Sequence, residues 1–260
     1  MKMTLKEKLQ AGNILMGFEI DYTDPSISEM ASRIGFDFLW LDMEHSSVNH
    51  ETMLTEIIAC SSGSAASVVR VPWNEPYVAK RILEMGPDGI IFPMVNSAAE
   101  ARIAMDSCMY PPYGKRGFGP RRACNYLLED MSVYINEVSD RFCRFIQIEH
   151  IDAVRDLDAI LKVSFLDGII VGPCDLSGSI GLLNDIYNPK VLKVIDEIVG
   201  KCKAAKIPAG IAVGADTPEL LKFWLDKGFQ FISAGSDMGE LGAAIKRRKL
   251  MMDKVRNECI

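Results

Sequence analysis

Residues 166–175 read LDGIIVGPCD, and the order of residue types in this stretch indicates the fold. The apolar run over residues 166–171 is short, rich in β-branched side chains and little interrupted by charge. Such a run is typical of a strand that is covered on both faces, as in a parallel sheet. A Gly-Pro turn and an acid follow it directly, so the stretch predicts a buried parallel strand that ends in a polar loop.

The same pattern occurs eight times, and longer amphipathic stretches separate the runs. The runs span residues 14–18, 36–41, 66–71, 89–95, 144–148, 166–171, 209–213 and 229–234. Eight strands that alternate with helices over 260 residues predict an α/β fold, a (β/α)8 TIM barrel, as a single domain over residues 1–260. An open doubly wound sheet is the alternative. No Gly-x-Gly-x-x-Gly turn follows the first run, so a dinucleotide site has little support.

Helix boundaries between the runs carry recognisable signals. Asp24-Pro25-Ser26 predicts a capped start for a helix over residues 27–34, with proline in the first turn. Ser97 predicts the start of a helix over residues 98–108. The segment 110–126, YPPYGKRGFGPRRACNY, is a long connection, and a loop of this length in a compact domain usually serves function or forms an interface.

The composition disfavours two classes of partner and indicates a compartment. The net charge of −6 makes nucleic acid and anionic membranes poor general partners. The N-terminal residues MKMTLKEKLQAGN lack the apolar stretch of a signal peptide, and no apolar run reaches the ~18 residues of a membrane helix. The seven cysteines form no Cys-x-x-Cys pair, which predicts reduced and mostly buried thiols in the cytoplasm. They are Cys60, Cys108, Cys124, Cys143, Cys174, Cys202 and Cys259.

Polar residues stand at or just after the ends of four runs. They are Asp42, Glu44, His45, Arg70, Gln147, Glu149 and Asp175. A barrel gathers the C-terminal ends of its strands on one face, where active sites lie. The sequence therefore predicts that a base, a guanidinium and several carboxylates meet at the mouth of the barrel.

Each of these residues allows a chemical reading and a structural one. Two carboxylates from separate strands, Glu149 and Asp175, suit Mg²⁺ or Mn²⁺, although they could also be surface acids or a helix cap. Arg70 could bind a carboxylate or enolate oxygen, or form a structural salt bridge. Pairing with Asp42 would orient His45 as a general base near neutral pH, whereas the alternative is a loop histidine that contacts Glu44 or solvent.

Several motifs resemble a known family. LWLDMEHSSVNH, YPPYGKRGFGP, FIQIEH and DGIIVGPCDLSGSIG are similar to successive motifs of the aldolase/citrate lyase family. The similarity runs over roughly residues 10–245, and the nearest branch is the class II pyruvate aldolases that cleave dihydroxyheptenedioate and 2-dehydro-3-deoxyglucarate. The resemblance implies a (β/α)8 barrel that binds Mg²⁺, Mn²⁺ or Co²⁺. It also implies a homohexamer, built as a trimer of dimers, that cleaves a 4-hydroxy-2-oxo acid to pyruvate and an aldehyde.

The resemblance also implies residue roles. Glu149 and Asp175 match the metal-binding carboxylates, and Arg70 matches the arginine at the pyruvyl oxygen. His45, oriented by Asp42, matches the catalytic base. The substrate-binding positions are Arg70, Gln147, Gly172, Pro173 and Cys174, of which the last three form the turn that receives the pyruvate carboxylate. The partners expected are therefore a small 2-oxo acid and an aldehyde.

Other readings remain open. The first run continues into Glu19 and Asp21, where the family commonly has an aromatic residue, so the natural aldehyde is not predicted. Arg121 and Arg122 could serve an anionic acceptor or a subunit contact, or form a salt bridge on the loop. An imine-forming aldolase needs a lysine inside the barrel, and none lies in the eight runs. An acyl-CoA lyase of the malyl or citryl type and a non-catalytic binding barrel are the remaining alternatives.

Overall fold

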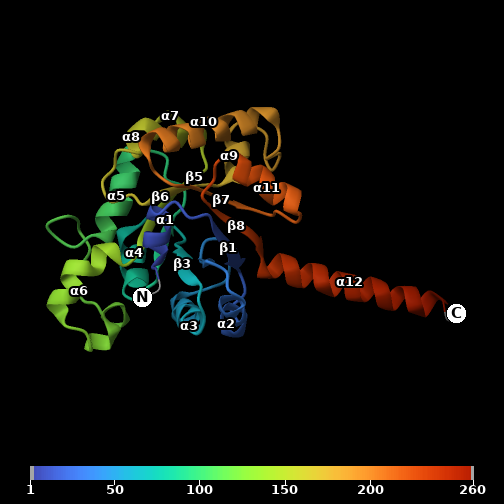
Figure 1. Ribbon diagram of the computed structural model, residues 1–260, viewed down its shortest axis with the longest axis horizontal. Helices are drawn as coiled ribbons and strands as arrows, with labels where there is room; N and C mark the ends of the chain where they lie inside the picture. Colours follow the sequence, from blue (N-terminus) through green and yellow to red (C-terminus); the bar gives the residue numbers. More distant parts are fainter. Residues whose placement is uncertain (1–2, 259–260) are drawn as a thin grey trace.

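The computed structural model describes residues 3–258 and has a closed barrel of eight strands at its centre (Figure 1). Every neighbouring pair is parallel, including the pair of β1 with β8 that closes the barrel. The strands are β1 Leu15–Ile20, β2 Phe38–Asp42, β3 Ala66–Arg70, β4 Gly89–Phe92, β5 Cys143–Ile148, β6 Gly168–Val171, β7 Ala209–Val213 and β8 Phe231–Ser236. The (β/α)8 TIM barrel predicted from the sequence is confirmed.

Helices alternate with the strands, and most of them cover the outside of the barrel (Figure 1). The α-helices are α1 Leu5–Gln10, α2 Pro25–Ile34, α3 His50–Cys60, α4 Pro76–Leu83, α5 Ala98–Cys108, α6 Met131–Glu137, α7 Ile151–Arg155, α8 Leu157–Ile160, α9 Pro173–Ser179, α10 Pro189–Ala205, α11 Pro218–Asp226 and α12 Asp237–Glu258. Two 3-10 segments, η1 Arg122–Leu127 and η2 Val138–Asp140, lie between α5 and β5. No helix within residues 3–258 is both long and apolar enough to cross a membrane.

The predicted boundary signals work as expected at α2 and α5. The Asp24 side chain accepts a hydrogen bond from the Ser26 N–H, with Pro25 in the first turn of α2. Ser97 caps α5, whose bounds agree with the prediction. Strands β1 and β8 extend two residues beyond the predicted runs, because the polar Glu19 and Ser236 still pair with each other. Apolar runs thus locate the strands but miss their polar C-terminal ends.

Large apolar side chains fill the inside of the barrel. Trp40, Phe145 and Phe231 are buried there, and Leu5 and Leu9 of α1 belong to the same cluster. A second, larger cluster lies between the strands and the surrounding helices. The barrel is therefore a packed core. The Trp40 ring lies at its upper end, 5.0 Å from the Arg70 guanidinium.

The cysteines are mostly structural. Six free thiols lie in residues 3–258, of which only Cys174 is exposed, and Cys259 is outside the described residues. This agrees with the expectation of small buried side chains for most of them.

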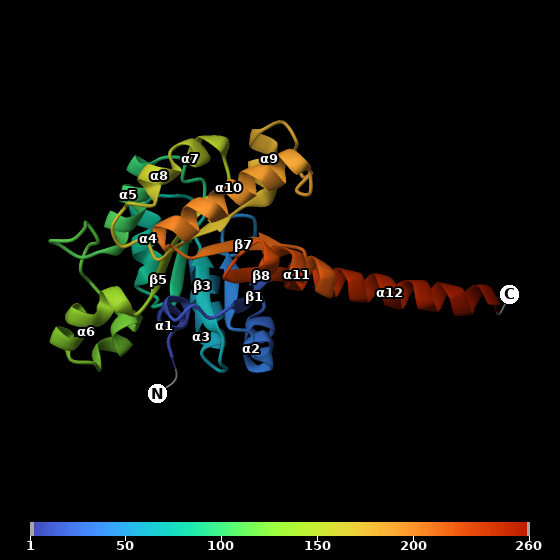
Figure 2. The ribbon, with the colours of Figure 1, turned by 45° about the horizontal axis from the view of Figure 1, so that its top comes forward.

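The last helix leaves the body of the protein. In both views α12 projects away from the barrel, far beyond the other helices (Figures 1 and 2). Of its residues only Asp237 is buried, and its main contacts are with β1 and β8. A helix with exposed apolar side chains normally packs on another apolar surface, and within residues 3–258 of one chain most of α12 packs on none.

Two glycines provide a test of the packed interior. A Cβ at Gly210 of β7 would lie 2.2 Å from the Phe231 ring, which itself packs against Phe145 with ring centroids 5.0 Å apart. We expect Gly210→Ala to lower the free energy of unfolding by about 1–3 kcal/mol, the usual cost of overpacking. Urea titration measures the change.

Gly200, in the middle of α10, is the matched control. An added Cβ there meets nothing within 4 Å. Gly200→Ala should raise the free energy of unfolding by about 0.5–1 kcal/mol, since alanine loses less conformational entropy in a helix. If Gly210→Ala were as stable as the Gly200 variant, the interior would not be tightly packed around Phe231.

Candidate active site

Charged side chains gather at the C-terminal ends of β1, β2, β3 and β5. Asp42, Arg70 and Glu149 are buried there, which is unusual for charged residues unless they are paired. The charge of Asp175, in the first turn of α9, acts on both Glu44 and Glu149. The structure thus brings the polar strand ends together at one mouth, as the sequence predicted.

Arg70 lies at the centre of this group and is only 8% exposed. Its Nε donates to Asp42 Oδ1 at 2.7 Å, and one Nη lies 3.3 Å from Glu19 Oε1. The other Nη lies 3.3 Å from Glu44 Oε2. The two readings left open by the sequence are therefore compatible. Arg70 forms salt bridges, yet a guanidinium has five N–H donors, so some remain for an incoming oxyanion.

Besides Arg70, Asp42 binds the backbone of the turn that follows β2. Its carboxylate accepts hydrogen bonds from the backbone N–H groups of Glu44, at 3.0 Å, and His45, at 2.9 Å. Burial alone would raise the pKa of Asp42, but the hydrogen bond and charge of Arg70, together with the two N–H donors, bring it below its ordinary value. Asp42 is thus an ionised anchor for Arg70 and for the start of the loop after β2.

The expected orientation of the His45 ring by Asp42 is not the one in the structure. The ring is 66% exposed, and its Nε2 lies 3.8 Å from Glu44 Oε2. The reason is local: an acid at a strand end readily accepts the N–H groups of the next two or three residues. That turn carries the His45 side chain away from Asp42. Glu44 is consequently the acid beside the imidazole, and burial raises the pKa of Glu44 to about 7 against the opposing charge of Arg70.

Glu149 is fixed by two donors. One carboxylate oxygen accepts the Met94 N–H, and the other accepts from Gln147 Nε2 at 2.8 Å. Burial raises the pKa of Glu149 to about 7; the Met94 N–H opposes this, and the charges of Glu44 and Asp175 add to it. Met94 has a φ of 53°, in the sparsely populated left-handed region, and nothing in the sequence indicated this backbone contribution.

The turn after β6 lies against Glu149. A Cβ at Gly172 would come within 2.5 Å of Glu149 Oε2, so only glycine fits there. Pro173 begins α9, and Cys174 lies beside Asn184, with Sγ 3.6 Å from its Oδ1. The turn expected to receive a carboxylate is therefore next to the acid expected to bind metal, and Gln147 lies between them.

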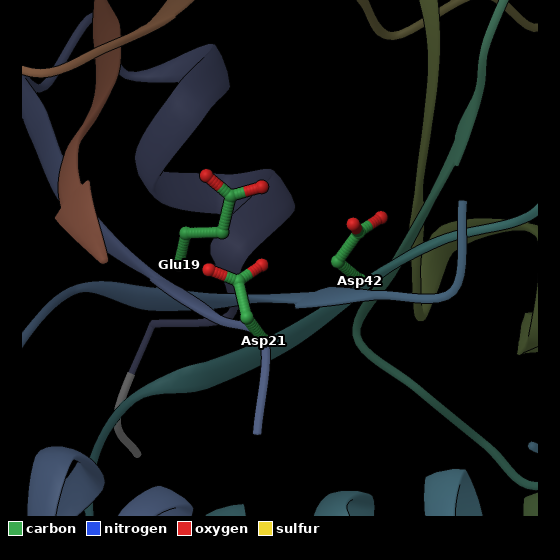
Figure 3. Close-up of side chains that lie close together, drawn as sticks. All are labelled: Glu19, Asp21 and Asp42. Carbon is green, nitrogen blue, oxygen red and sulfur yellow. The ribbon is translucent and has the colours of Figure 1, made fainter. Parts of the chain in front are cut away.

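Two acidic groups at the mouth could hold a divalent cation, and their donor atoms differ in availability. Carboxylate oxygens of Glu19, Asp21 and Asp42 lie within 4.8 Å of one another and point into the same space (Figure 3). Arg70 already supplies a positive charge to Glu19 and Asp42, and both Asp42 oxygens are hydrogen-bonded. Arg70 therefore neutralises part of the charge of that group, and Glu19 keeps the most freedom to bind a further partner.

The second group consists of Glu149, Asp175 and Glu44, and both oxygens of Glu149 accept hydrogen bonds as well. Glu149 and Asp175 are like charges near each other, and a third acid, Glu44, adds to the repulsion. The Gln147 Oε1 atom is buried without a hydrogen-bond partner among residues 3–258. Buried oxygens in need of positive charge are the donor set that Mg²⁺ and Mn²⁺ prefer. Glu19 and Asp21 had no predicted role in the site; their spacing of two at the C-terminal end of β1, where Asp21 directly follows the strand, was the available signal.

The two arginines of the long loop lie elsewhere. Arg122 donates to the backbone oxygen of Met85 at 2.6 Å and to that of Gly86 at 3.3 Å. These residues connect α4 to β4, at the end of the barrel opposite the mouth. Arg121 donates to the Pro120 oxygen. Neither arginine reaches the site of its own barrel, so the prediction that they bind an anionic acceptor there is wrong. The reason is that a connection from a helix to the next strand returns to the N-terminal end of the strands.

Known proteins with similar sequences or folds identify the family of this chain. Residues 18–244 match the model of the HpcH/HpaI aldolase/citrate lyase family. A 4-hydroxy-2-oxo-heptane-1,7-dioate aldolase from Salmonella dublin is 33% identical over 91% of this chain and 89% of its own length. An HpcH/HpaI aldolase from Desulfitobacterium hafniense has a TM-score of 0.90 and 25% identity, covering 96% of this chain and 97% of its own. A family protein from Burkholderia cenocepacia J2315 has a TM-score of 0.89 and 25% identity, with 97% and 98% covered.

The electrostatics of the mouth predict a pH-dependent stability. Burial, despite the opposing charge of Arg70, raises the pKa of Glu19 from 4.5 to about 7. Folding therefore favours the protonated form: this stability is fully present below pH 4.5 and is lost as the pH rises through about 7. We expect Glu19→Gln to be more stable than the wild type at about pH 8.5, by about 1–3 kcal/mol. The gain should shrink toward about pH 5.

Thermal unfolding across this pH range measures the difference. Glu29→Gln is the control, because it removes one negative charge from a half-exposed residue of α2 that pairs with Arg33 at 2.6 Å, far from the mouth of the barrel. Its unfolding midpoint should track that of the wild type at every pH. A Glu19→Gln protein that was less stable than the wild type at high pH would show that the Arg70 contact outweighs the burial of the charge.

Proposed function

This chain belongs to the HpcH/HpaI aldolase/citrate lyase family and is a carbon–carbon lyase, and from that premise we propose that it reversibly cleaves a 4-hydroxy-2-oxo acid to pyruvate and an aldehyde. The observation that carries the proposal is the buried Arg70 guanidinium at the same mouth as buried Glu149. Such a pair of opposite charges suits a substrate that develops negative charge next to a carboxylate.

The proposed cofactor is a divalent metal, Mg²⁺, Mn²⁺ or Co²⁺, held by Glu149 and Asp175. Support comes from the mutual repulsion of these acids with Glu44 and from the unpartnered Gln147 oxygen. When bound, such an ion supplies a Lewis acid for the 2-oxo group of the substrate. The family is generally dependent on divalent metals, which favours this assignment over a site without metal.

The residues of the chain then have separable tasks. Arg70 donates to the 2-oxo oxygen and stabilises the negative charge that develops on it as the C3–C4 bond breaks. Asp42 and Trp40 hold the guanidinium in place. The turn from Gly172 to Cys174 receives the substrate carboxylate, and Gln147 lines the site between this turn and Glu149.

Proton transfer is assigned to His45. In cleavage its imidazole takes the proton of the 4-hydroxyl group, the electron pair of the C3–C4 bond moves to C3, and the aldehyde leaves. C3 is later protonated to give pyruvate. Glu44, rather than Asp42, lies beside the ring and is positioned to stabilise its protonated form.

The imine alternative finds no support at the mouth. Lys6 is the buried lysine among residues 3–258, and it pairs with Asp167 at 3.1 Å in the pocket at the N-terminal end of the barrel. The named relatives act on a dioate, and for this chain we propose only the pyruvate half of that chemistry. The other half of that chemistry is the aldehyde, and the mouth of this barrel carries two acids, Glu19 and Asp21, that an aldehyde would meet.

Proton exchange at C3 of pyruvate tests the proposed function without an acceptor. With Mn²⁺, wild-type protein in D₂O should exchange the methyl protons of pyruvate, as followed by proton NMR. Arg70→Ala should slow exchange about 10²–10³-fold, the usual loss for an oxyanion donor. If the wild type exchanged these protons with none of the three metals, the proposal would be overturned.

A pair of variants decides which acids hold the metal. Asp175→Asn should weaken Mn²⁺ binding strongly, as measured by electron paramagnetic resonance, whereas Asp21→Asn should bind Mn²⁺ like the wild type. The reverse result would assign the ion to Glu19, Asp21 and Asp42. Both variants change one carboxylate to an amide, so their net charges match.

We also propose that the protein is a homo-oligomer, a hexamer built as a trimer of dimers, in which α12 packs on a second copy. Support comes from the exposed apolar side chains of α12. Leu250 and Met251 are two of them, and the others form a stripe at helical spacing, which consists of Met238, Leu241, Ile245, Met252 and Val255. Such a stripe on a projecting helix is typical of a surface that a partner covers. The N-terminal part of this helix also closes the end of β1, through bonds from the Asp21 and Tyr22 N–H groups to Asp237.

Light scattering of the eluting protein tests the assembly. Ile245→Glu should lower the mass in solution, because it places a charge on the apolar stripe. Lys246→Glu, one residue along and turned away from the stripe, is the control and should keep the wild-type mass. A monomeric wild type, or equal masses for the two variants, would contradict the role of α12.

A further inference from the structure

Glu19 stands between Arg70 and the open part of the mouth. It lies at the C-terminal end of β1, and one carboxylate oxygen is 3.3 Å from an Arg70 Nη. Its side chain is 24% exposed. Glu19 also lines a groove of about 560 Å³ between the barrel mouth and α12. A molecule that reacts beside Arg70 and extends toward solvent on this side therefore passes Glu19.

The groove is acidic. Glu19, Asp216 and Glu240 line it, and Arg247 is the basic residue among its described lining residues. Asp21 and Asp42 reach within 4.8 Å of Glu19, and Asp237 adds its charge nearby. The loop arginines that could have neutralised an anion lie at the other end of the barrel. A second carboxylate on a substrate would meet like charges here.

Glu19 is the acid of this group with most freedom to contact a ligand. Asp42 is occupied by Arg70 and two backbone N–H groups. Asp237 accepts the N–H groups of Asp21 and Tyr22, and Asp21 bonds Ser236. Among residues 3–258 the side chain of Glu19 has one polar partner, the Arg70 Nη at 3.3 Å. A carboxylate in this position accepts hydrogen bonds from hydroxyl groups and repels anions.

We propose that Glu19 selects the aldehyde: it accepts a hydrogen bond from a hydroxyl group of a neutral, hydroxylated aldehyde and excludes aldehydes that end in a carboxylate. The inference rests on the proposed aldol function and names its acceptor class. In condensation a C–H bond at C3 of pyruvate breaks and a bond forms from C3 to the aldehyde carbon. The aldehyde oxygen takes up a proton, so the reaction needs no further reactant. Selection operates on the part of the aldehyde beyond its reacting carbon.

Two matched pairs of acceptors test the selection at about pH 8.5, where the Glu19 carboxyl group is ionised, with pyruvate and Mn²⁺ and with product formation as the readout. Glyceraldehyde against propanal tests the hydroxyl contact, and succinic semialdehyde against butanal tests the exclusion of a carboxylate. For the wild type we expect kcat/KM to be about tenfold higher with glyceraldehyde than with propanal. It should be about tenfold lower with succinic semialdehyde than with butanal.

Glu19→Gln keeps the shape of the side chain and removes its charge. The succinic semialdehyde to butanal ratio should rise about tenfold in this variant, whereas the ratio in Glu29→Gln should equal that of the wild type. Ratios between acceptors are independent of any change in overall turnover that follows from the Arg70 contact. The half-exposed Glu29 on α2 carries the same change in net charge.

The outcomes separate this inference from the proposed function. A wild type that prefers succinic semialdehyde over butanal, or a Glu19→Gln protein with unchanged ratios, overturns the selection by Glu19 alone, provided that pyruvate still exchanges its C3 protons. A wild type without that exchange overturns the aldol function itself. Shifted ratios in Glu19→Gln together with wild-type ratios in Glu29→Gln support the assignment.

Discussion

The site depends on one buried guanidinium. Arg70 cannot leave water without compensation, and three carboxylates on two neighbouring strands and the loop after them provide it. Trp40 closes the space below, so the group is held from the side and from beneath. Glu19, Asp42 and Arg70 lie on the neighbouring strands β1, β2 and β3. The pairing of these strands in the closed barrel therefore sets the geometry of the ion pairs.

The same arrangement leaves the mouth with an excess of negative charge. Burial raises the pKa of Glu19, Glu44 and Glu149 to about 7 in each case, since one arginine cannot satisfy them all. Such a site is costly to the folded state when it is empty. A bound cation would relieve the repulsion between Glu149 and its neighbours, and a substrate oxygen would take up the remaining Arg70 donors. The features that lower stability are those that favour the ligands.

The sequence predicts the barrel because buried parallel strands leave a pattern of apolar runs, and it predicts much of the mouth because strand ends converge. It cannot predict side-chain direction inside a turn. His45 is three residues from Asp42, as expected, yet its N–H and not its ring meets that acid. Glu149 is likewise fixed partly by the backbone of Met94, for which no residue type gives a signal. The location of Arg122 could have been predicted from the sequence, because a segment between a helix and the next strand lies at the N-terminal end of the barrel.

The path of α12 links the mouth to the proposed assembly. In a barrel of this type the last helix would be expected to return along the outside, but here it projects outward from the end of β8 (Figure 2). Met30 and Ile34 of α2 remain exposed on the side of the barrel, and α12 carries its own exposed apolar stripe. Both surfaces would be covered if copies of the chain exchanged this helix. Asp237, the first residue of α12, binds the backbone just after Glu19, at Asp21 and Tyr22. Packing of α12 on a second copy would therefore hold the end of β1, and with it the acid that faces the substrate.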